Sequence, residues 1–260
     1  MTSMKPTSIV RKWHHATAMC LMIAGCSIPS YSADTNTSGD YLPVDVIVEK
    51  LQAANLRRAE ALGGYTGKRF YKVDYRGFPG GRHAEMIVEA AYTSPAQKHF
   101  RIISESGSKL LLQRVLHRLL DSEREALQNA NREQTALSTE NYTFRFVDTE
   151  QGADGKFYVL QVEPKFKNKF LYRGTIWVDA ADFAVARIEG KPAKNPSWWI
   201  SSTEIHHRYT KIDRFWLPVH NESVTHVRVG GQAVLTIEYT DYNIKLATAA
   251  ESVPSSSAER

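Results

Sequence analysis

The chain has 260 residues, and its 33 Lys and Arg exceed its 28 Asp and Glu, which gives a formal net charge of +5. Lys5, Arg11 and Lys12 stand in the first 25 residues without any acid, so removing them leaves only +2 from Cys26 onward. So small an excess, without a clustered basic footprint, excludes a nucleic-acid-binding protein. The only cysteines, Cys20 and Cys26, fall near the N-terminus, which excludes a disulfide, a thiolate metal site and a cysteine nucleophile from the rest of the chain.

The N-terminal segment predicts export. Its basic start precedes a mostly apolar run, residues 16–25, which is too short for a membrane-spanning helix of about 20 residues and is typical of a signal peptide. The run ends in Ile23-Ala-Gly-Cys26, an order that resembles a bacterial lipobox. The resemblance implies cleavage before Cys26 and acylation of its thiol and new amine. An alternative stays open, because Ser30-Tyr-Ser32 suits ordinary signal cleavage, which would release a soluble periplasmic protein starting at Ala33.

Composition predicts four segments. Residues 1–25 are the signal peptide, and residues 26–41 hold the lipidated cysteine and a polar stretch that we expect to be a flexible tether. Residues 42–247 are long enough for one domain with one sizeable core, and residues 248–260 are expected to be a disordered tail. Ser27 stands where Asp retains some lipoproteins at the inner membrane, so we expect an outer-membrane lipoprotein that faces the periplasm.

Two helices are predicted within the domain. The first runs from about Val44 to Leu62 with apolar residues near the 3.6-residue period, and Gly63-Gly64 stops it. The second runs from Lys109 to about Asn129 and is rich in leucine. Its apolar residues spread far around the helix axis, which predicts burial on more than one side.

Strand patterns fill the rest of the domain. Turns rich in Gly, Pro and Asp separate them, and the connections are too short for parallel crossovers, so we expect an antiparallel, meander-like sheet. The second helix interrupts this meander once. The expected strands are 66–75, 84–92, 98–104, 142–148, 157–163, 171–178, 184–189, 204–211, 215–228 and 233–245.

Bulky side chains occupy both faces of some strands. In 171–178, Tyr172, Ile176 and Val178 alternate with Leu171 and Trp177. With only two helices to cover the sheet, this pattern suggests a curved sheet that encloses an apolar cavity. A tight core between sheet and helices fits the same pattern, and both interpretations stay open.

Several segments resemble a known family. They are Gly174-Thr-Ile-Trp-Val-Asp179, 183–190, 192–200, Trp216-Leu-Pro218 and 235–242. Together they resemble the outer-membrane lipoprotein-sorting protein-like group, which shares the fold of the carriers LolA and LolB. The resemblance implies an α+β fold in which a curved antiparallel sheet forms an unclosed half-barrel, with about two helices on its concave face. It also implies an apolar concave surface that holds acyl chains.

Aromatic and aliphatic side chains are the candidates for lining such a cavity. A buried acyl chain gains about 0.8 kcal/mol per methylene, so apolar lining suffices to hold one without catalytic chemistry. Each candidate also fits an ordinary core position. The candidates are Tyr71, Met86, Tyr92, Phe100, Leu116, Leu120, Trp177 and Trp199.

Enzymatic signals are weak. The stretch 63–68 imitates a phosphate-binding loop with the wrong spacing, and no nucleophile elbow or zinc-binding helix motif exists. His206 and His207 are adjacent in a strand and face opposite ways, while His220 and His226 stand about 20 Å apart along theirs. Asp179 begins an Asp-Ala-Ala-Asp turn, which explains it without a functional role. We therefore expect no catalytic residue, no metal site and no cofactor.

Three hypotheses follow. The preferred one is a lipid-anchored envelope protein that holds a lipid or lipoprotein acyl chain in the half-barrel, with a role in lipoprotein sorting. The second is an envelope regulatory or scaffold protein on the same fold, whose partner would be an unidentified protein. The third is a hydrolase whose site leaves no recognisable motif.

Overall fold

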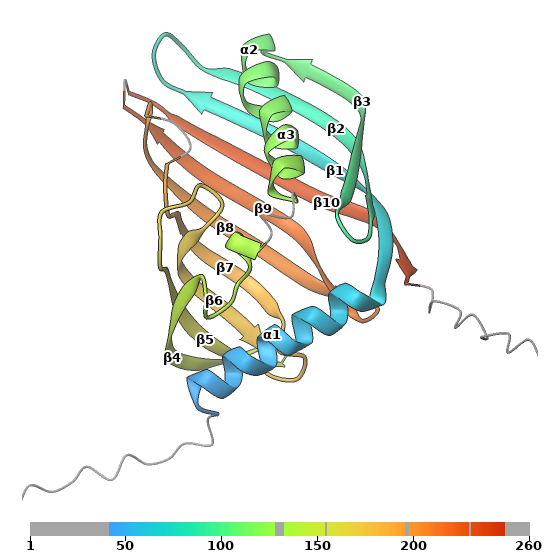
Figure 1. The fold of residues 1–260 in the computed structure, drawn as a ribbon. Coiled ribbons are helices and arrows are strands. Elements are labelled where there is room, and N and C mark those ends of the chain that lie inside the picture. Colours follow the sequence, from blue (N-terminus) through green and yellow to red (C-terminus); the bar gives the residue numbers. More distant parts are fainter. Residues whose placement is uncertain (1–41, 128–132, 154, 196–197, 229, 248–260) are drawn as a thin grey trace, which may run out of the picture. The chain divides into compact units, whose positions relative to one another are not determined.

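The computed structural model describes residues 42–127, 133–153, 155–195, 198–228 and 230–247. The predicted signal peptide, the lipidation site at Cys26, the tether and the tail lie outside these residues. Within the described residues a ten-stranded antiparallel sheet carries helices on one face (Figure 1). The predicted α+β half-barrel is confirmed, because the sheet is curved and is not closed.

The elements follow the predicted order along the chain. Helix α1 (Val44–Ala61) precedes three strands, and a helical connection leads to seven more. In chain order they are β1 (Leu62–Arg76), β2 (Arg82–Thr93), β3 (Gln97–Gly107), α2 (Lys109–Leu111), the π-helix η1 (Leu112–Leu116), α3 (His117–Ala126), β4 (Tyr142–Gly152), β5 (Gly155–Pro164), β6 (Tyr172–Asp179), β7 (Val185–Pro192), β8 (Ile200–Ile212), β9 (Phe215–Val227) and β10 (Gln232–Leu246).

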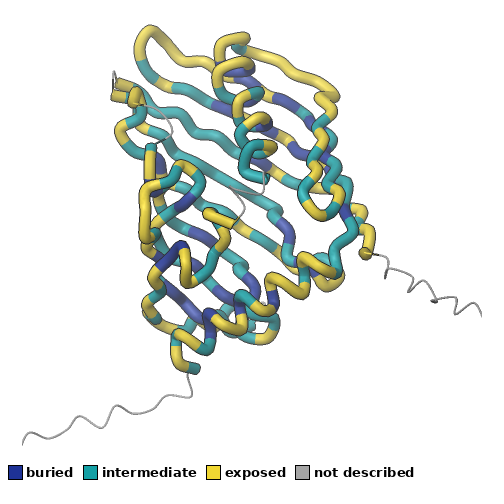
Figure 2. The backbone as a smooth tube through the Cα atoms, in the orientation of Figure 1, coloured by how far each residue is buried: buried dark blue, intermediate teal, exposed yellow. Residues whose placement is uncertain are grey.

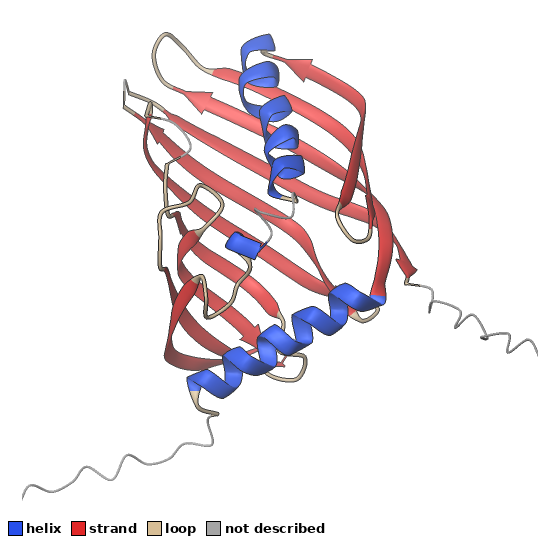
Figure 3. Cartoon of the chain, in the orientation of Figure 1, coloured by secondary structure: helices blue, strands red, loops and turns tan. Residues whose placement is uncertain are grey.

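The strand order explains why the helices lie on one face. The order is β3-β2-β1-β10-β9-β8-β7-β6-β5-β4, so β3 and β4 are the two edges, although they follow one another in the chain. Their connection must therefore cross from one edge of the sheet to the other, and α2, η1 and α3 lie within it (Figure 3). The crossing covers part of the concave face.

Two hydrophobic clusters divide the concave face (Figure 2). The first packs Ile47, Val48 and Leu51 of α1 against β4–β7, and it includes Leu160 and Ile176. The second packs the helices α2, η1 and α3 against β1, β2 and β10. Its buried members are Tyr71, Val73, Ala84, Met86, Val88, Leu111, Leu112, Leu116, Leu120 and Ile237.

The junction between α1 and β1 differs from the prediction. The helix ends at Ala61 and β1 begins at the next residue, so Gly63 and Gly64 lie within the strand rather than after a helix stop. A Cβ atom at Gly63 would stand 2.4 Å from the carbonyl oxygen of Leu246, and one at Gly64 would stand 2.5 Å from that of Tyr92. Glycine is required there because β10 and β2 approach the backbone of β1 closely.

The second helix also differs from the prediction. It contains the π-helical turn η1, which adds a residue to the turn. Leu111, Leu112, Leu116 and Leu120 all join the second cluster, whereas Leu110 is 53% exposed. The leucine-rich helix therefore packs these four leucines against the sheet, and Val115 and Leu119 are partly buried beside them.

Candidate functional site

The concave face changes character across the sheet. One row of side chains runs through paired positions on six neighbouring strands: Tyr71, Ile237, Asn221, His207, Ile188 and Ile176. The outer members of this row are buried in the two clusters beneath the helices. The middle strands β8 and β9 lie between α1 and α3 (Figure 1), and there the row is polar.

A cavity of about 350 Å³ occupies this middle region, and we call it the inner cavity. Its floor is formed by β8, β9 and β10, α3 forms one wall, and Phe170 approaches from the segment before β6. Its volume lies in the range of small-molecule sites. The lining residues are Leu119, Ser122, Glu123, Ala126, Phe170, Thr203, Ile205, His207, Asn221, Glu222, Ser223, Leu235, Ile237 and Tyr239.

Uncharged polar groups stand in the apolar floor. The Nδ2 of Asn221 donates a hydrogen bond to the hydroxyl of Tyr239 at 2.8 Å, while its Oδ1 is buried without a partner among the described residues. Burial, with His206 and His220 adding to it, lowers the pKa of His207 to about 4, so this imidazole is neutral near pH 7. Burial also raises the pKa of Tyr239 well above its ordinary value. These three floor side chains, Asn221, His207 and Tyr239, are polar without carrying a charge.

An ion cluster fastens α3 at the edge of the inner cavity. Glu123 of α3 accepts a hydrogen bond from Arg69 of β1 at 2.7 Å and another from Lys98 of β3. Arg69 is only 3% exposed and also donates to the hydroxyl of Tyr71 at 3.1 Å. Burial alone would raise the pKa of Glu123, but Lys98 and Arg69 outweigh it and hold that pKa below its ordinary value. The cluster ties the cavity wall to two strands.

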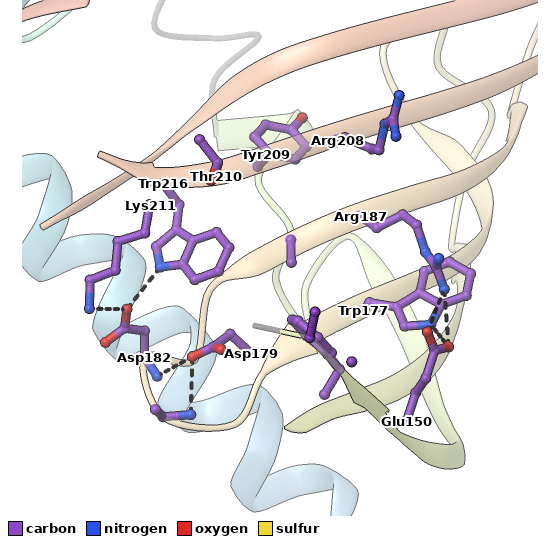
Figure 4. Close-up of a pocket in the computed structure, with 15 residues that line it drawn as sticks. Glu150, Trp177, Asp179, Asp182, Arg187, Arg208, Tyr209, Thr210, Lys211 and Trp216 are labelled. Carbon is purple, nitrogen blue, oxygen red and sulfur yellow. Dashed lines mark hydrogen bonds and ion pairs between the residues drawn. The ribbon is translucent and has the colours of Figure 1, made fainter. Parts of the chain in front are cut away.

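A second hollow, the outer groove, lies on the opposite face of β4–β8 and has a volume of about 520 Å³ (Figure 4). Trp177 faces it because its neighbours Ile176 and Val178 are buried on the concave side. The guanidinium of Arg187 lies 3.6 Å from the centre of the Trp177 ring. Both side chains donate to Glu150, from Trp177 Nε1 at 2.7 Å and from Arg187 at 3.1 Å.

Acidic groups at the other end of the outer groove are also engaged. Asp182 accepts from Lys211 at 2.6 Å and from the indole of Trp216 at 3.0 Å. Asp179 accepts from the backbone N–H groups of Ala181 and Asp182, as the predicted turn requires. These pairings stabilise the strand ends and leave the carboxylates little capacity for a ligand.

The predicted cavity residues fall into different surroundings. Tyr71, Met86, Leu116 and Leu120 are at most 3% exposed and fill the second cluster, so binding by them requires α3 to move away from the sheet. Phe100 packs on the edge of that cluster, with the guanidinium of Arg69 above its ring.

The remaining candidates lie apart from one another. Tyr92 stacks on Tyr65 at a ring distance of 5.4 Å, and Trp177 lines the outer groove. Trp199 is 47% exposed and stacks on Trp198. Among the described residues, none of the candidates lines the inner cavity, and ligand binding by any of them stays a prediction.

Within the described ranges, no three His, Cys, Asp or Glu side chains are arranged to hold a metal ion. Among the helices seen there, none combines the length and the apolar character needed to cross a membrane.

Comparison with known proteins gives similarities of structure only. No family model matches the chain, and no curated protein matches it. An outer membrane lipoprotein-sorting protein domain from Vibrio parahaemolyticus is 14% identical, with 76% of this chain and 93% of that chain covered and a TM-score of 0.37. A DUF1329 family protein from Desulfovibrio piger is 12% identical, with 80% and 96% covered and a TM-score of 0.39.

A third solved structure, a LolA superfamily protein from Nitrosomonas europaea, is 12% identical, with 79% of this chain and 94% of that chain covered and a TM-score of 0.34. The first and third structures carry the names of the groups that the sequence resembles. At such TM-scores these likenesses carry no argument about ligand or partner, and the half-barrel rests on the strand order of this chain itself.

Proposed function

We propose that this protein is a non-catalytic binding protein of the cell envelope, which holds an acyl chain of a lipid or lipoprotein in the inner cavity. The carrying observation is the position of that cavity, which lies on the concave face between α3 and the middle strands. Leu119, Ile205, Leu235, Ile237 and Phe170 supply its apolar surface. The outer groove supports binding less well, because its acidic groups already have partners.

The energetics of such binding are favourable. A chain that buries about ten methylenes gains about 8 kcal/mol, before the cost of immobilising it is subtracted. That gain requires neither a cofactor nor a reactive side chain. The cavity opens between elements that are already folded, so little further ordering is needed on binding.

The proposal also includes a location at a membrane, which the N-terminal segment supports. Acylation of Cys26 would anchor the chain to the outer membrane, on its periplasmic side, through a tether whose average span is about 20 Å. The lipobox order and the short apolar run support this. Cleavage after Ser32 would instead make the protein a soluble periplasmic carrier.

One observation favours the regulatory or scaffold alternative. Trp198 and Trp199 are 68% and 47% exposed, and their rings stack at 3.7 Å at the start of β8. Exposed aromatic pairs are enriched at sites where proteins dock on partners. Loss of partner capture on changing both residues to Ser, with lipid uptake unchanged, would favour this alternative.

Lipid uptake by protein produced without residues 1–32 tests the main proposal. Bound lipid is extracted and identified by mass spectrometry, and uptake of the uncharged fluorescent probe N-phenyl-1-naphthylamine is titrated. Ser223→Phe fills the inner cavity and should weaken uptake about tenfold or more. Thr236→Phe is the matched control, because Thr236 is not part of the cavity lining while its neighbours Leu235 and Ile237 are, so its side chain points to the opposite face of β10. Absence of co-purifying lipid together with no uptake would refute the binding function.

The anchor has a separate test. Cys26→Ala should abolish metabolic labelling with palmitate and should leave unprocessed precursor in the membrane fraction. Unchanged processing at Ser32 in this variant would show that the lipobox interpretation is wrong.

A further inference from the structure

The amide of Asn221 has incomplete hydrogen bonding at the floor of the inner cavity. Its Nδ2 donates to Tyr239, and its buried Oδ1 has no partner among the described residues. Exchanging the two amide atoms does not remove the deficit, because the Tyr239 hydroxyl could then donate to Oδ1 and Nδ2 would be unpaired. A buried polar atom without a partner destabilises the protein unless something else pairs with it.

His207 offers a second open position beside Asn221. The two residues are direct partners in the register of β8 and β9, so their side chains stand next to each other on the same face. The neutral imidazole has one N–H donor and one acceptor nitrogen, and no hydrogen bond engages it among the described residues. Asn221 and His207 together therefore present both a donor and an acceptor to the cavity.

The charges around the cavity disfavour an anion. Among the described residues, no Lys or Arg lines the cavity, while Glu123 and Glu222 both do. The nearby cations Arg69 and Lys98 are already paired with Glu123. A carboxylate held in this cavity would lose its hydration without meeting a cation.

We propose that the inner cavity selects an acyl chain linked through an uncharged amide, and that Asn221 and His207 recognise this amide. This deepens the proposed function and rests on it. The N–H of the ligand amide donates to Asn221 Oδ1, and its carbonyl oxygen accepts from the imidazole N–H of His207. The hydrocarbon chain then lies on the apolar floor along Ile205, Leu235 and Ile237. An N-acylated amine, such as the acylated terminus of a lipoprotein, presents this chemistry.

Three probes of equal chain length test the selectivity at pH 7.4. N-palmitoylethanolamine carries the amide, methyl palmitate carries an uncharged ester without a donor, and palmitate carries a charge. Their affinities are measured by displacement of the fluorescent probe N-phenyl-1-naphthylamine. We expect the amide to bind at least tenfold more tightly than palmitate.

Variants assign this preference to the two residues. Asn221→Leu should weaken binding of the amide about tenfold and leave the affinity for methyl palmitate within threefold. His207→Phe keeps a ring of similar size and should also weaken the amide about tenfold, which provides a second readout if Asn221→Leu fails to fold. Asn243→Leu makes the same change at an exposed position of β10 and should alter no affinity.

The outcomes separate the two proposals. If all three probes bind with similar affinity, or if both variants retain the preference for the amide, the selectivity is overturned while the binding function stands. If no probe binds, both are overturned.

Discussion

The two helix-covered regions of the concave face are held by different chemistry. Helix α1 meets the sheet through a purely apolar cluster, and Arg58 adds hydrogen bonds from its side chain to the carbonyl oxygens of Asp182 and Phe183 at 2.9 Å each. Helix α3 also packs on an apolar cluster, but in addition its Glu123 pairs with two largely buried cations, Arg69 and Lys98.

This difference has a functional meaning. Moving α1 away from the sheet would expose apolar surface, whereas moving α3 away would also leave the charges of Arg69 and Lys98 without their anion in a largely buried site. Since α3 is also a wall of the inner cavity, the ionic fastening stands next to the proposed ligand. The region around α1 serves as the support, and the region around α3 borders the site.

The largest effect is expected in the α1 region. Leu51→Ala removes a fully buried side chain and should lower the free energy of unfolding by about 4 kcal/mol, because the loss of apolar burial is joined by a cavity. Urea denaturation measures it. Leu56→Ala, at a position that is 62% exposed, is the control and should change stability by less than about 0.5 kcal/mol. Equal effects of the two changes would contradict the assigned packing of α1.

In the α3 region, Glu123→Gln should cost about 3 kcal/mol, because Arg69 is left buried without an anion. Arg69→Met and Lys98→Met combined with Glu123→Leu remove all three charges of the ion cluster and should recover most of this loss. A triple variant as unstable as Glu123→Gln would show that the ion cluster does not account for the effect. The measurement is again urea denaturation, at low and high salt.

The neutral His207 predicts a pH dependence. Its pKa in the folded protein is about 4, below the ordinary 6.5, so the unfolded chain takes up a proton first as pH falls. The contribution of neutral His207 to the free energy of unfolding is therefore complete above about pH 6.5 and is lost toward pH 4. Between pH 7 and pH 5 the free energy of unfolding should decrease by about 2 kcal/mol. The carboxylates of Glu123 and Glu222 line the same cavity, and the lowered pKa of Glu123 acts in the same direction at lower pH.

Stability measured between pH 7 and 5 checks this. His207→Gln should flatten the dependence over that range, and the exposed His99→Gln should leave it as in the unchanged protein. If His207→Gln shows the same pH dependence of stability as the unchanged protein, other titratable groups cause it.

The smallest effect concerns Arg58. Arg58→Met removes two hydrogen bonds to backbone carbonyls while keeping much of the side-chain volume, and should cost about 1 kcal/mol. Arg57→Met, at an exposed position one residue earlier, should be neutral in the same denaturation experiment. A loss at Arg57 as large as that at Arg58 would refute a specific attachment of α1 at this point.

The sequence predicts the elements well because their signals are local. Strand alternation and turn residues identify the ten strands, and the 3.6-residue period identifies α1. The strand order is harder to predict from the sequence, since the pairing of β1 with β10 joins residues at opposite ends of the domain. No local pattern in either strand specifies that partner.

The inner cavity illustrates the same limit. Large apolar residues were the natural candidates, yet Tyr71, Met86, Leu116 and Leu120 are large enough to fill the space beneath α3. The cavity instead lies where Ser223, Thr203 and Asn221 leave room. The available signal was the run of small or polar residues at alternate positions of β8 and β9, which becomes meaningful only when the register between these strands is known.

The position of β10 has a consequence for the order of folding. In the described sheet, β1–β3 join the other strands through β10, which follows the other nine strands along the chain. A chain that emerges with its N-terminus first can assemble each side of the sheet separately, but it cannot unite them until residues 232–246 arrive. Such non-local pairing is slow to form. The floor of the inner cavity includes β10, so this cavity cannot be complete before residues 232–246 have joined the sheet.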